Sequence, residues 1–526
     1  MDASKPRTLD ASSLRHAAQR PDKPAILCQD RRISYLSLHW ESNRAAYALL
    51  HGGARPGDRI AYLGRESELF YELALACAKA GTVFVPVNWR LTAPEVDHIL
   101  RDSGALVLFV EREYLAKAEA LRTDLPSLRT VVELDGPAGH DEGFRRWKDA
   151  AGPDAAGDMQ PIAGPDDPVL QIYTSGTTGF PKGVVLAHRS FYTLPEATGE
   201  QGAQWIDWRE DDVSMISLPG FGIAGMGWFM HGFAAGATNV VMRMYVPEEA
   251  VRLIRDESVT TTFVAPAMLR MMLDEPGVAP QTFKSLRKVA YGAAPITTEL
   301  LQESLKVFGC DFAQIYASTE TGSVAVCLSP SLHIPGSPLL ASAGRACPGN
   351  AVKIIDTDGN TLPPGEIGQV CVKTPAHMVE YWNHPEATAK TLVDGWLRMS
   401  DAGHLDENGF LFLGDRINDT IIAAGQNIYP AEVEKAIGAH PAVADVAVVG
   451  APDALWGDAV QAFVVLKPGG NASPRELGRF LHDRIADYKV PSRWEFVDAI
   501  PRNPGGKILR RVLREQAKSA AERRNP

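Results

Sequence analysis

The chain has 526 residues, of which 45% are hydrophobic and 22% are charged. At about 150 residues per domain this length predicts more than one domain, and the mean hydropathy of -0.12 is too polar for a multi-span membrane protein. The formal net charge of -11 argues against a general nucleic-acid binder, because that function needs a positive field. Any polyanionic ligand must therefore be held by local donors.

Cysteine usage and the N-terminal sequence predict a reduced, cytoplasmic setting. The six cysteines show neither a Cys-x-x-Cys spacing nor a short Cys/His cluster suited to zinc, and the first residues lead into polar sequence rather than a signal peptide. Residues 213–242 contain no Asp, Glu, Lys or Arg, but Pro219, His231 and six glycines interrupt them. We expect a buried strand, a tight turn and a glycine-rich helix there rather than a membrane span.

The pattern along the chain predicts an α/β fold with two domains. Strand-like runs at 59–63 and 106–110 alternate with helical sequence such as 67–80. Residues 152–168 carry four prolines and three glycines, which predicts a surface connection. A strand at 169–173 follows this connection directly.

A second boundary is predicted near residues 414–419, before a compact β/α pattern with strands at 446–449 and 461–466. We therefore predict a large, multi-subdomain N-terminal domain over residues 1–415 and a small α+β domain over residues 416–526. The basic C-terminal sequence is expected to form a solvated terminal helix rather than a partner-binding patch.

The segment from Tyr173 to Gly183 is rich in groups that bind phosphate. Its glycines let backbone N–H groups approach an anion, its hydroxyls add donors, and its lysine adds a positive charge. It is not the P-loop motif, because Pro181 and Gly183 stand where that motif has a glycine and a hydroxyl. The predicted phosphate cradle consists of Thr174, Ser175, Gly176, Thr177, Thr178, Gly179 and Lys182.

This segment resembles the signature of the adenylate-forming superfamily of acyl-CoA synthetases, peptide-synthetase adenylation domains and luciferases. Further motifs similar to those of the family follow in order along the chain. They are Gly292-Ala293-Ala294-Pro295 for the adenine-side loop, Tyr316-Ala317-Ser318-Thr319-Glu320 for Tyr-Gly-x-Thr-Glu, Ser400-Asp401 with Gly414-Asp415-Arg416 for the ribose pair, and residues 504–511, which include Lys507, for the C-terminal lysine motif.

The resemblance implies a role for each matching residue in binding MgATP. Glu320 is expected to supply an oxygen to Mg²⁺, a hard cation that takes carboxylate and phosphate ligands. Asp401 is expected to accept from the ribose hydroxyls, and Arg416 to reach ribose or phosphate oxygen. Lys507 is expected to bridge the substrate carboxylate and the α-phosphate. Adenine is expected beside Ala293, Ala294, Pro295, Tyr316 and Ala317, and the remaining catalytic groups are Thr319 and Lys182.

A second half-reaction is implied by residues 424–430, which resemble the segment that lines the thiol tunnel after the small, mobile domain rotates. Gly425, Gln426 and Asn427 are the expected tunnel residues, and Asn418 is the expected hinge. Ala424 and Gln426 depart from the Gly and Glu of the family segment. The stretch 83–91 resembles one frequent in acyl- and aryl-CoA synthetases, which favours CoA as the acceptor.

The expected function is that of an acyl-CoA synthetase using ATP, Mg²⁺ and CoA. The carboxylate of a small-molecule acid is converted to acyl-AMP and pyrophosphate, and the CoA thiol then displaces AMP. One alternative is a ligase that transfers the acyl group to an amine or a carrier-protein thiol, and another is a non-catalytic nucleotide- or acyl-adenylate-binding protein. No nucleic-acid partner or membrane span is expected, and the protein is expected to be a monomer or a homodimer.

The acyl pocket is predicted from residues 218–225, which resemble a family segment that often carries an aromatic residue followed by His. Here Gly222 occupies the His position after Phe221, and the resemblance places Gly225, Met226 and Gly292 in the pocket as well. We expect a roomy hydrophobic pocket for a bulky aromatic, alicyclic or medium-chain acid. The alternative is that Gly222 only satisfies a tight backbone turn.

Overall fold

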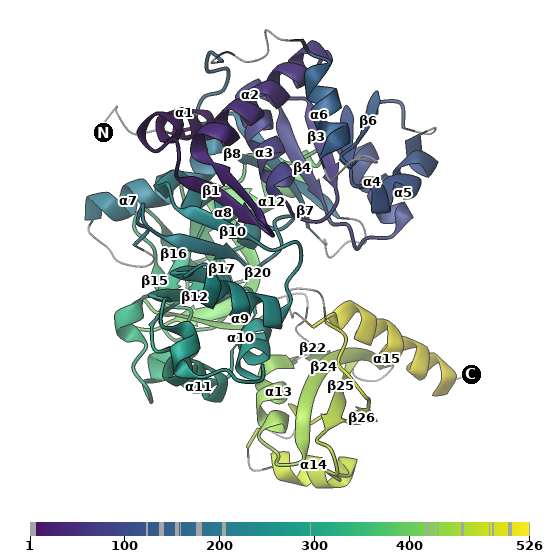
Figure 1. Ribbon diagram of the computed structural model, residues 1–526. Coiled ribbons are helices and arrows are strands. Elements are labelled where there is room, and N and C mark those ends of the chain that lie inside the picture. Colours follow the sequence, from purple (N-terminus) through teal and green to yellow (C-terminus); the bar gives the residue numbers. More distant parts are fainter. Residues whose placement is uncertain are drawn as a thin grey trace. The chain divides into compact units, whose positions relative to one another are not determined.

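The chain divides into two compact units, residues 1–351 with 372–397 and residues 352–371 with 398–526. The structure is a computed structural model (Figure 1). The predicted domain boundary after residue 415 stays a prediction. All residues are described except 1–6, 123–124, 136–140, 153–156, 158, 175–180, 202–206, 295, 417–418, 420, 424–425, 429, 454–456, 483, 486–488, 503–507 and 525–526.

The first unit contains a seven-stranded, largely parallel sheet in which β8 and β18 are the antiparallel strands. Its order is β18 (Glu380–Tyr381), β8 (Lys182–Ala187), β7 (Pro168–Thr174), β4 (Val83–Val87), β3 (Arg59–Leu63), β5 (Val107–Val110) and β6 (Thr130–Glu133). The predicted strands at 59–63, 106–110 and 169–173 therefore correspond to β3, β5 and β7.

Both faces of this sheet are covered around its central strands, which explains why β3, β4 and β5 are mainly apolar. Ala61 and Leu63 face a core shared with α4 (Ala93–Ser103) and α5 (Arg112–Arg122). Tyr62, on the opposite face, packs edge-on against Phe70 of α3 (Glu68–Ala80), with ring centroids 5.0 Å apart. Every residue of α3 is buried. The helices α2 (Tyr35–His51) and α6 (Glu142–Asp149) lie on the same side of the sheet as α3 (Figure 1).

A nine-stranded sheet forms the other part of the first unit. Its central strands, from β13 to β1, are parallel, and β2, β14 and β15 are antiparallel to their neighbours. Its order is β15 (Arg345–Ala346), β14 (Val326–Leu328), β13 (Asp311–Tyr316), β12 (Lys288–Gly292), β11 (Thr261–Val264), β9 (Val213–Ile216), β10 (Thr238–Val241), β1 (Pro24–Cys28) and β2 (Arg31–Ser34).

Helices connect the parallel strands of the nine-stranded sheet, as crossover connections require. They include α8 (Ile223–Ala235), α9 (Pro247–Asp256), α10 (Pro266–Leu273) and α11 (Thr298–Phe308), while α1 (Leu9–Gln19) precedes β1 and α7 (Thr193–Gln201) precedes β9. The apolar run 213–242 is a strand (β9), a turn, the helix α8 and a second strand (β10), so the predicted strand, turn and helix are confirmed. Within the described residues, no helix is long and apolar enough to cross a membrane.

A third, five-stranded sheet carries the segment predicted to bind ribose. Its order is β16 (Ala351–Ile355), β17 (Gly368–Lys373), β20 (Trp396–Leu405) and β19 (Leu392–Val393), and β21 (Leu411–Arg416) pairs with β20. The short helix α12 (Pro385–Thr391) begins with a proline at its first position, where no backbone donor is lost.

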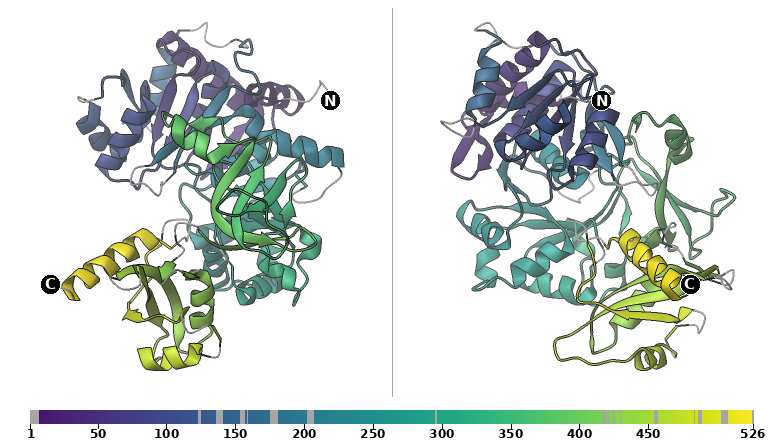
Figure 2. Two further views of the ribbon diagram at one scale, coloured as in Figure 1. Left: turned by 180° about the vertical axis from the view of Figure 1, so that it is seen from behind. Right: turned by 90° about the vertical axis from the view of Figure 1, so that its right-hand side faces the viewer.

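The C-terminal part of the second unit is a small α+β fold, seen in yellow-green in Figure 2. Its sheet has the order β23 (Gln426–Ile428), β22 (Ile421–Ala423), β25 (Gly457–Leu466) and β24 (Val443–Asp453), with β26 (Arg493–Phe496) beside β25. Val446 and Val448 face a core with α13 (Pro430–Gly438) and α14 (Pro474–Leu481), and Ala447 and Val449 face α15 (Arg510–Arg524). The predicted strands at 446–449 and 461–466 are confirmed as parts of β24 and β25.

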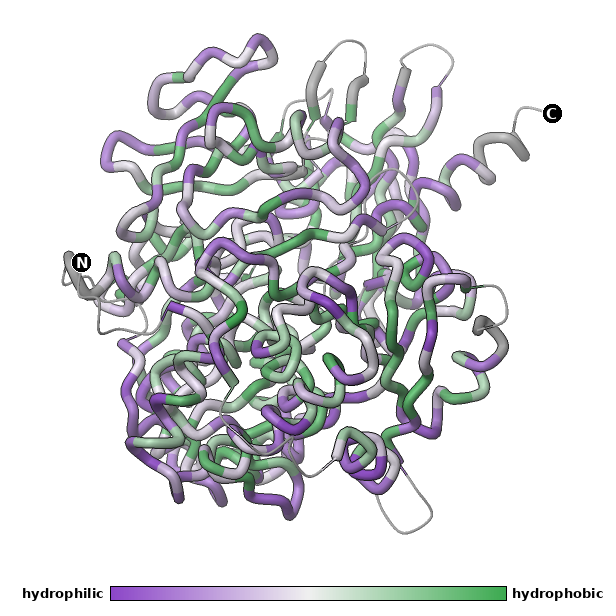
Figure 3. Tube along the Cα trace, turned by 90° about the horizontal axis from the view of Figure 1, so that it is seen from above, coloured by the Kyte–Doolittle hydropathy of each residue, from purple (hydrophilic) through white to green (hydrophobic). Residues whose placement is uncertain are grey.

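Hydrophobic stretches of the chain trace run mainly through its inner parts, and hydrophilic stretches are frequent at its outer bends (Figure 3). The six cysteines form no disulfide, and all but Cys310 are buried. The reduced, cytoplasmic setting expected from the sequence stays a prediction.

Candidate active site

Three predicted site segments follow neighbouring parallel strands of the nine-stranded sheet. Phe221 and Gly222 follow β9, Gly292 ends β12, and Tyr316 ends β13. Since β9, β11, β12 and β13 are mutually parallel, their carboxyl ends lie at one edge of the sheet. Ligands of open parallel sheets bind at this edge, so the topology brings the predicted adenine and acyl segments to one side of the fold.

The end of β12 lies very close to β13. A Cβ on Gly292 would lie only 2.3 Å from the carbonyl oxygen of Ile315, so glycine is required for this approach. The next residue, Ala293, is exposed and has a φ of 65°, a left-handed conformation that costs a non-glycine residue about 1 kcal/mol or more. Ala294 is half-buried, and Pro295 lies outside the described residues.

The loop after β13 is held in a tight turn by Thr321, which sequence reasoning missed. The Thr321 Oγ1 accepts a hydrogen bond from the Ser318 N–H at 3.0 Å and lies 2.8 Å from the carbonyl oxygens of Ser318 and Ser323. Thr319 is buried within this turn, and Ala317 is exposed. A hydroxyl three residues after a serine is the signal that could have identified the turn.

Glu320 is oriented by Tyr381, a second residue that the motif reading missed. The Tyr381 hydroxyl donates to Glu320 Oε1 at 2.7 Å, and the Met378 N–H donates to the Glu320 carbonyl oxygen at 2.8 Å. Burial and the Glu320 carboxylate raise the pKa of Tyr381, which keeps its hydroxyl protonated as a donor. Within the described part of the chain, Glu320 Oε2 accepts no hydrogen bond.

One carboxylate with an uncommitted oxygen fits the predicted Mg²⁺ site. Mg²⁺ commonly takes one or two protein carboxylates and fills its other positions with phosphate oxygens and waters. The described residues contain no cluster of three or more His, Cys, Asp or Glu side chains suited to a metal. A single carboxylate such as that of Glu320 suits a metal that arrives with a polyphosphate.

Lys182 lies on the same side of the seven-stranded sheet as Tyr381. Its Nζ is 5.6 Å from the centroid of the Tyr381 ring, within cation–π range. Lys182 begins β8 and pairs with Thr174 at the end of β7, so the two residues stand at the base of one hairpin. Both are half-buried. The remaining cradle residues, Ser175, Gly176, Thr177, Thr178 and Gly179, lie outside the described residues.

The acyl segment does not need a glycine at Gly222. Gly222 has a φ of -118°, and a Cβ there would meet the Pro219 carbonyl oxygen at an ordinary 3.5 Å. At Gly225, by contrast, a Cβ would lie 2.1 Å from the carbonyl oxygen of Leu218. Phe221 is half-buried and Met226 is fully buried. Close packing therefore requires glycine at Gly225, in the first turn of α8, whereas neither backbone strain nor a steric clash requires it at Gly222.

Asp401 and Arg416 are paired residues on adjacent strands of the five-stranded sheet. They are direct partners in the antiparallel register of β20 and β21, and Asp401 is half-buried. Gln426 and Asn427 lie in β23, where they pair with Ala423 and Ile422. The side chains of Arg416, Gln426 and Asn427 lie outside the described part, as do the whole residues Asn418, Gly425 and Lys507.

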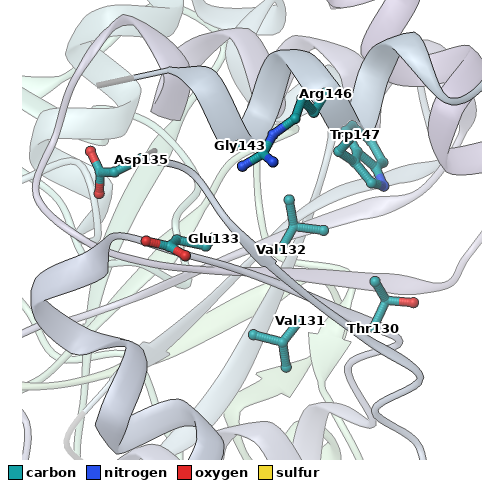
Figure 4. Close-up of a pocket in the computed structure, with 8 residues that line it drawn as sticks. All are labelled: Thr130, Val131, Val132, Glu133, Asp135, Gly143, Arg146 and Trp147. Carbon is teal, nitrogen blue, oxygen red and sulfur yellow. The ribbon is translucent and has the colours of Figure 1, made fainter. Parts of the chain in front are cut away.

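A pocket between β6 and α6 is lined by none of the predicted site residues (Figure 4). Its acidic side chains are already engaged, since Arg112 Nε donates to Glu133 at 2.6 Å and the Arg112 N–H donates to Asp135 at 2.8 Å. The strand-end site therefore stays the candidate active site.

Two family comparisons agree with this geometry. Residues 14–382 match the family described as AMP-binding enzyme, and residues 432–507 match the AMP-binding enzyme C-terminal domain. The chain belongs to the AMP-binding enzyme family. The resemblance inferred from the motifs is thus confirmed, and so is the fold class of a large α/β N-terminal domain with a small C-terminal domain.

Relatives of this AMP-binding enzyme are acid–thiol ligases. The chain is 52% identical over 510 residues to the fatty acid–[acyl-carrier-protein] ligase ScoC of Streptomyces coeruleorubidus, covering 97% of this chain and 96% of ScoC. It is 35% identical to the indoleacetate–CoA ligase of Aromatoleum aromaticum, with 95% and 96% covered. Its fold matches ATP-bound MatB from Rhodopseudomonas palustris with a TM-score of 0.88 and 28% identity, covering 98% and 99%.

These comparisons establish the class of reaction. The AMP-binding enzyme is an adenylate-forming, AMP-forming acid–thiol ligase that uses ATP. The acceptor thiol is the part of the sequence-based prediction that they leave open, because ScoC is named for a carrier protein and other relatives are named for CoA.

Proposed function

We propose that this enzyme activates a fatty acid as its acyl-adenylate and transfers the acyl group to the thiol of an acyl carrier protein. The observation that carries the proposal is the 52% identity to ScoC across 97% of the chain, against 35% for the indoleacetate–CoA ligase. The mainly apolar acyl segment with its half-buried Phe221 and its side-chain-free Gly222 is consistent with a hydrophobic acid.

In the first step, a carboxylate oxygen attacks the α-phosphorus of ATP, and the bond to the pyrophosphate oxygen breaks. Glu320, held by Tyr381, is the proposed Mg²⁺ ligand, and the metal supplies charge that offsets the phosphates. Lys182, Thr319 and the loop from Thr174 to Gly179 are the proposed phosphate donors. The proposed adenine pocket is Gly292 to Pro295 with Tyr316 and Ala317. Asp401 and Arg416 are the proposed ribose ligands, and Lys507 is the residue proposed to contact the reacting oxygens.

In the second step, the thiol sulfur attacks the acyl carbonyl carbon, AMP leaves with the bonding electron pair, and a thioester forms. The proposed tunnel residues are Gly425, Gln426 and Asn427, reached after a rotation about Asn418. Replacing one difficult displacement by two easier ones is the usual advantage of a covalent adenylate.

CoA is a second candidate acceptor, and it was the acceptor predicted from the sequence. Two observations favour it: relatives named as CoA ligases, among them FadD13 of Mycobacterium tuberculosis at 35% identity, and the 83–91 stretch that resembles acyl- and aryl-CoA synthetases. A shared acyl-adenylate chemistry serves both acceptors, so the difference lies in the second step alone.

The test compares the two acceptors under the same conditions of adenylate formation. Purified enzyme, ATP, Mg²⁺ and a saturated fatty acid are incubated with holo acyl carrier protein or CoA at equal thiol concentration, and the thioesters are measured by mass spectrometry. We expect the acyl carrier protein to be loaded at least tenfold faster. Equal or faster formation of acyl-CoA would favour the second candidate, and pyrophosphate release without any thioester would contradict both.

A further inference from the structure

Glu66 is a buried carboxylate that joins the two sheets of the first unit. It lies on the loop between β3 and α3 and is 8% exposed. Its Oε1 accepts a hydrogen bond from the Gly220 N–H at 2.7 Å, and its Oε2 accepts one from the Tyr71 hydroxyl at 2.8 Å. The first bond connects residues 154 positions apart, so it ties the loop after β3 to the acyl segment after β9.

The acyl segment from Leu218 to Gly222 is held on its other side by helix α8. The close approach of Gly225 to the carbonyl oxygen of Leu218 leaves no space between the first turn of α8 and this segment. Gly220 is similarly confined, because a Cβ there would lie 3.0 Å from Phe70 and 3.1 Å from Glu66. Tyr71 stacks on Phe229 of α8, with centroids 3.9 Å apart. Glu66 and its neighbours therefore define where the segment lies.

Burial of an ionisable group at this position costs free energy, because the charged form loses its hydration. Burial raises the pKa of Glu66 to about 7, and the two hydrogen bonds only partly oppose this effect. Within the described residues, no cation pairs with Glu66. Perturbed buried carboxylates next to a binding segment are more often found at functional positions than in the ordinary core.

We propose that Glu66 is a positioning residue that sets the location of the acyl segment Leu218–Gly222 and thereby the chain-length preference of adenylation. The inference rests on the proposed function, because it takes this segment as part of the acyl pocket. Glu66 acts through the Gly220 backbone, and no contact with ATP or with the reacting atoms is required.

The test compares three variants on a series of straight-chain fatty acids from short to long, read by pyrophosphate release. Glu66→Ala leaves the Gly220 N–H and the Tyr71 hydroxyl without an acceptor, so we expect the KM of the preferred acid to rise about tenfold. The preference for that acid over its neighbours should shrink, while the KM for ATP stays within about twofold. Glu66→Gln keeps an acceptor for the Gly220 N–H and a donor toward Tyr71, so it should restore the wild-type preference.

Glu72→Gln is the matched control. Glu72 lies on α3 itself and is 6% exposed, but its carboxylate pairs with Lys148 at 2.7 Å and does not contact the acyl segment. This variant should lose stability without changing the chain-length preference. A changed chain-length preference in Glu72→Gln would overturn the inference, and so would an unchanged preference in Glu66→Ala. The inference would also be overturned if Glu66→Gln changed the preference as much as Glu66→Ala does.

Gly220→Ala tests the same contact from the other side if Glu66→Ala does not fold. The added methyl group must displace Phe70 or Glu66, so the same shift in preference is expected, and an unchanged preference overturns the proposal. A wild type without acid-dependent pyrophosphate release would refute the proposed function itself. An active wild type with insensitive variants would refute only the role of Glu66.

Discussion

At the scale of single residues, the site depends on side chains that orient the motif residues. Glu320 belongs to the recognised motif, but its direction is set by the hydroxyl of Tyr381, which belongs to β18. Groups that hold a metal ligand in place commonly contribute tenfold or more to metal affinity. The same logic distinguishes Glu66, which touches the acyl segment, from the nearby Glu72, which does not.

Tyr381→Phe removes the hydrogen bond to Glu320 and should weaken the use of Mg²⁺. We expect the Mg²⁺ concentration for half-maximal adenylation to rise about tenfold, because the carboxylate loses its fixed orientation. Tyr245→Phe is the control, since the Tyr245 hydroxyl donates to the Met268 carbonyl oxygen at 3.0 Å and not to Glu320. A Mg²⁺ titration of the three proteins is the measurement, and coincident curves would remove Tyr381 from the site.

Glu66 should also make stability depend on pH in a predictable direction. Its pKa is raised to about 7 in the folded protein, so the folded state holds the proton more tightly than the unfolded chain. The folded state is therefore favoured most below the unfolded pKa and loses about 3 kcal/mol as the pH rises toward 7. Glu66→Gln lacks this loss. Thermal unfolding should show that the stability of Glu66→Gln relative to the wild type is higher at pH 8 than at pH 5. An equal difference in stability at the two pH values would contradict the raised pKa of Glu66.

At the scale of elements, two glycines near the start of α8 look alike in the sequence but differ in their structural roles. Gly222 precedes the helix with an ordinary backbone conformation, whereas Gly225 touches the Leu218 carbonyl oxygen. The strand, turn and helix of residues 213–242 follow from local composition, but the different roles of their glycines follow from packing.

Substitutions at these two glycines should therefore differ. Gly225→Ala should destabilise the protein by about 2 kcal/mol or more, because backbone atoms cannot yield as side chains can. Gly222→Ser should fold like the wild type, since serine is a good helix N-cap. Thermal unfolding of both variants tests the contrast, and equal losses at the two positions would refute it.

The space at Gly222 also leads to a prediction about substrate size. Gly222→His should penalise the bulkiest accepted acids most and leave smaller acids and the KM for ATP unchanged. Pyrophosphate release across an acid-size series measures this. Uniform loss across the series would show that the residue does not face the acyl group, and strong wild-type activity on acetate would refute a roomy pocket.

At the scale of the whole molecule, the two half-reactions are expected to use different residues of the second unit. Lys507 is assigned to adenylation, and Gly425, Gln426 and Asn427 are assigned to the thiol step. Lys507→Ala should lower adenylation about a hundred- to thousandfold, the usual effect of losing an electrostatic contact in a transition state. Thioester formation from supplied acyl-AMP should be nearly unchanged, and equal losses in both half-reactions would refute a role confined to the first step.

The sequence by itself determined the family, the order of the site motifs, the strands around 59–63 and 446–449, and a strand within the run 213–242. These properties are local: a glycine- and hydroxyl-rich loop or an apolar run of strand length carries its information in adjacent residues. The sequence likewise indicated an acid–thiol ligase, because its motifs resemble those of the adenylate-forming superfamily in type and order.

Only the tertiary structure decided how distant residues support those motifs. Tyr381 reaches Glu320 across 61 positions. Glu66 reaches Gly220 across 154 positions, although the strands that precede them, β3 and β9, belong to different sheets. No periodicity within either segment encodes such a contact. Such contacts depend on the order of the strands and on the handedness of the connections between them, and the packing of the whole unit sets both.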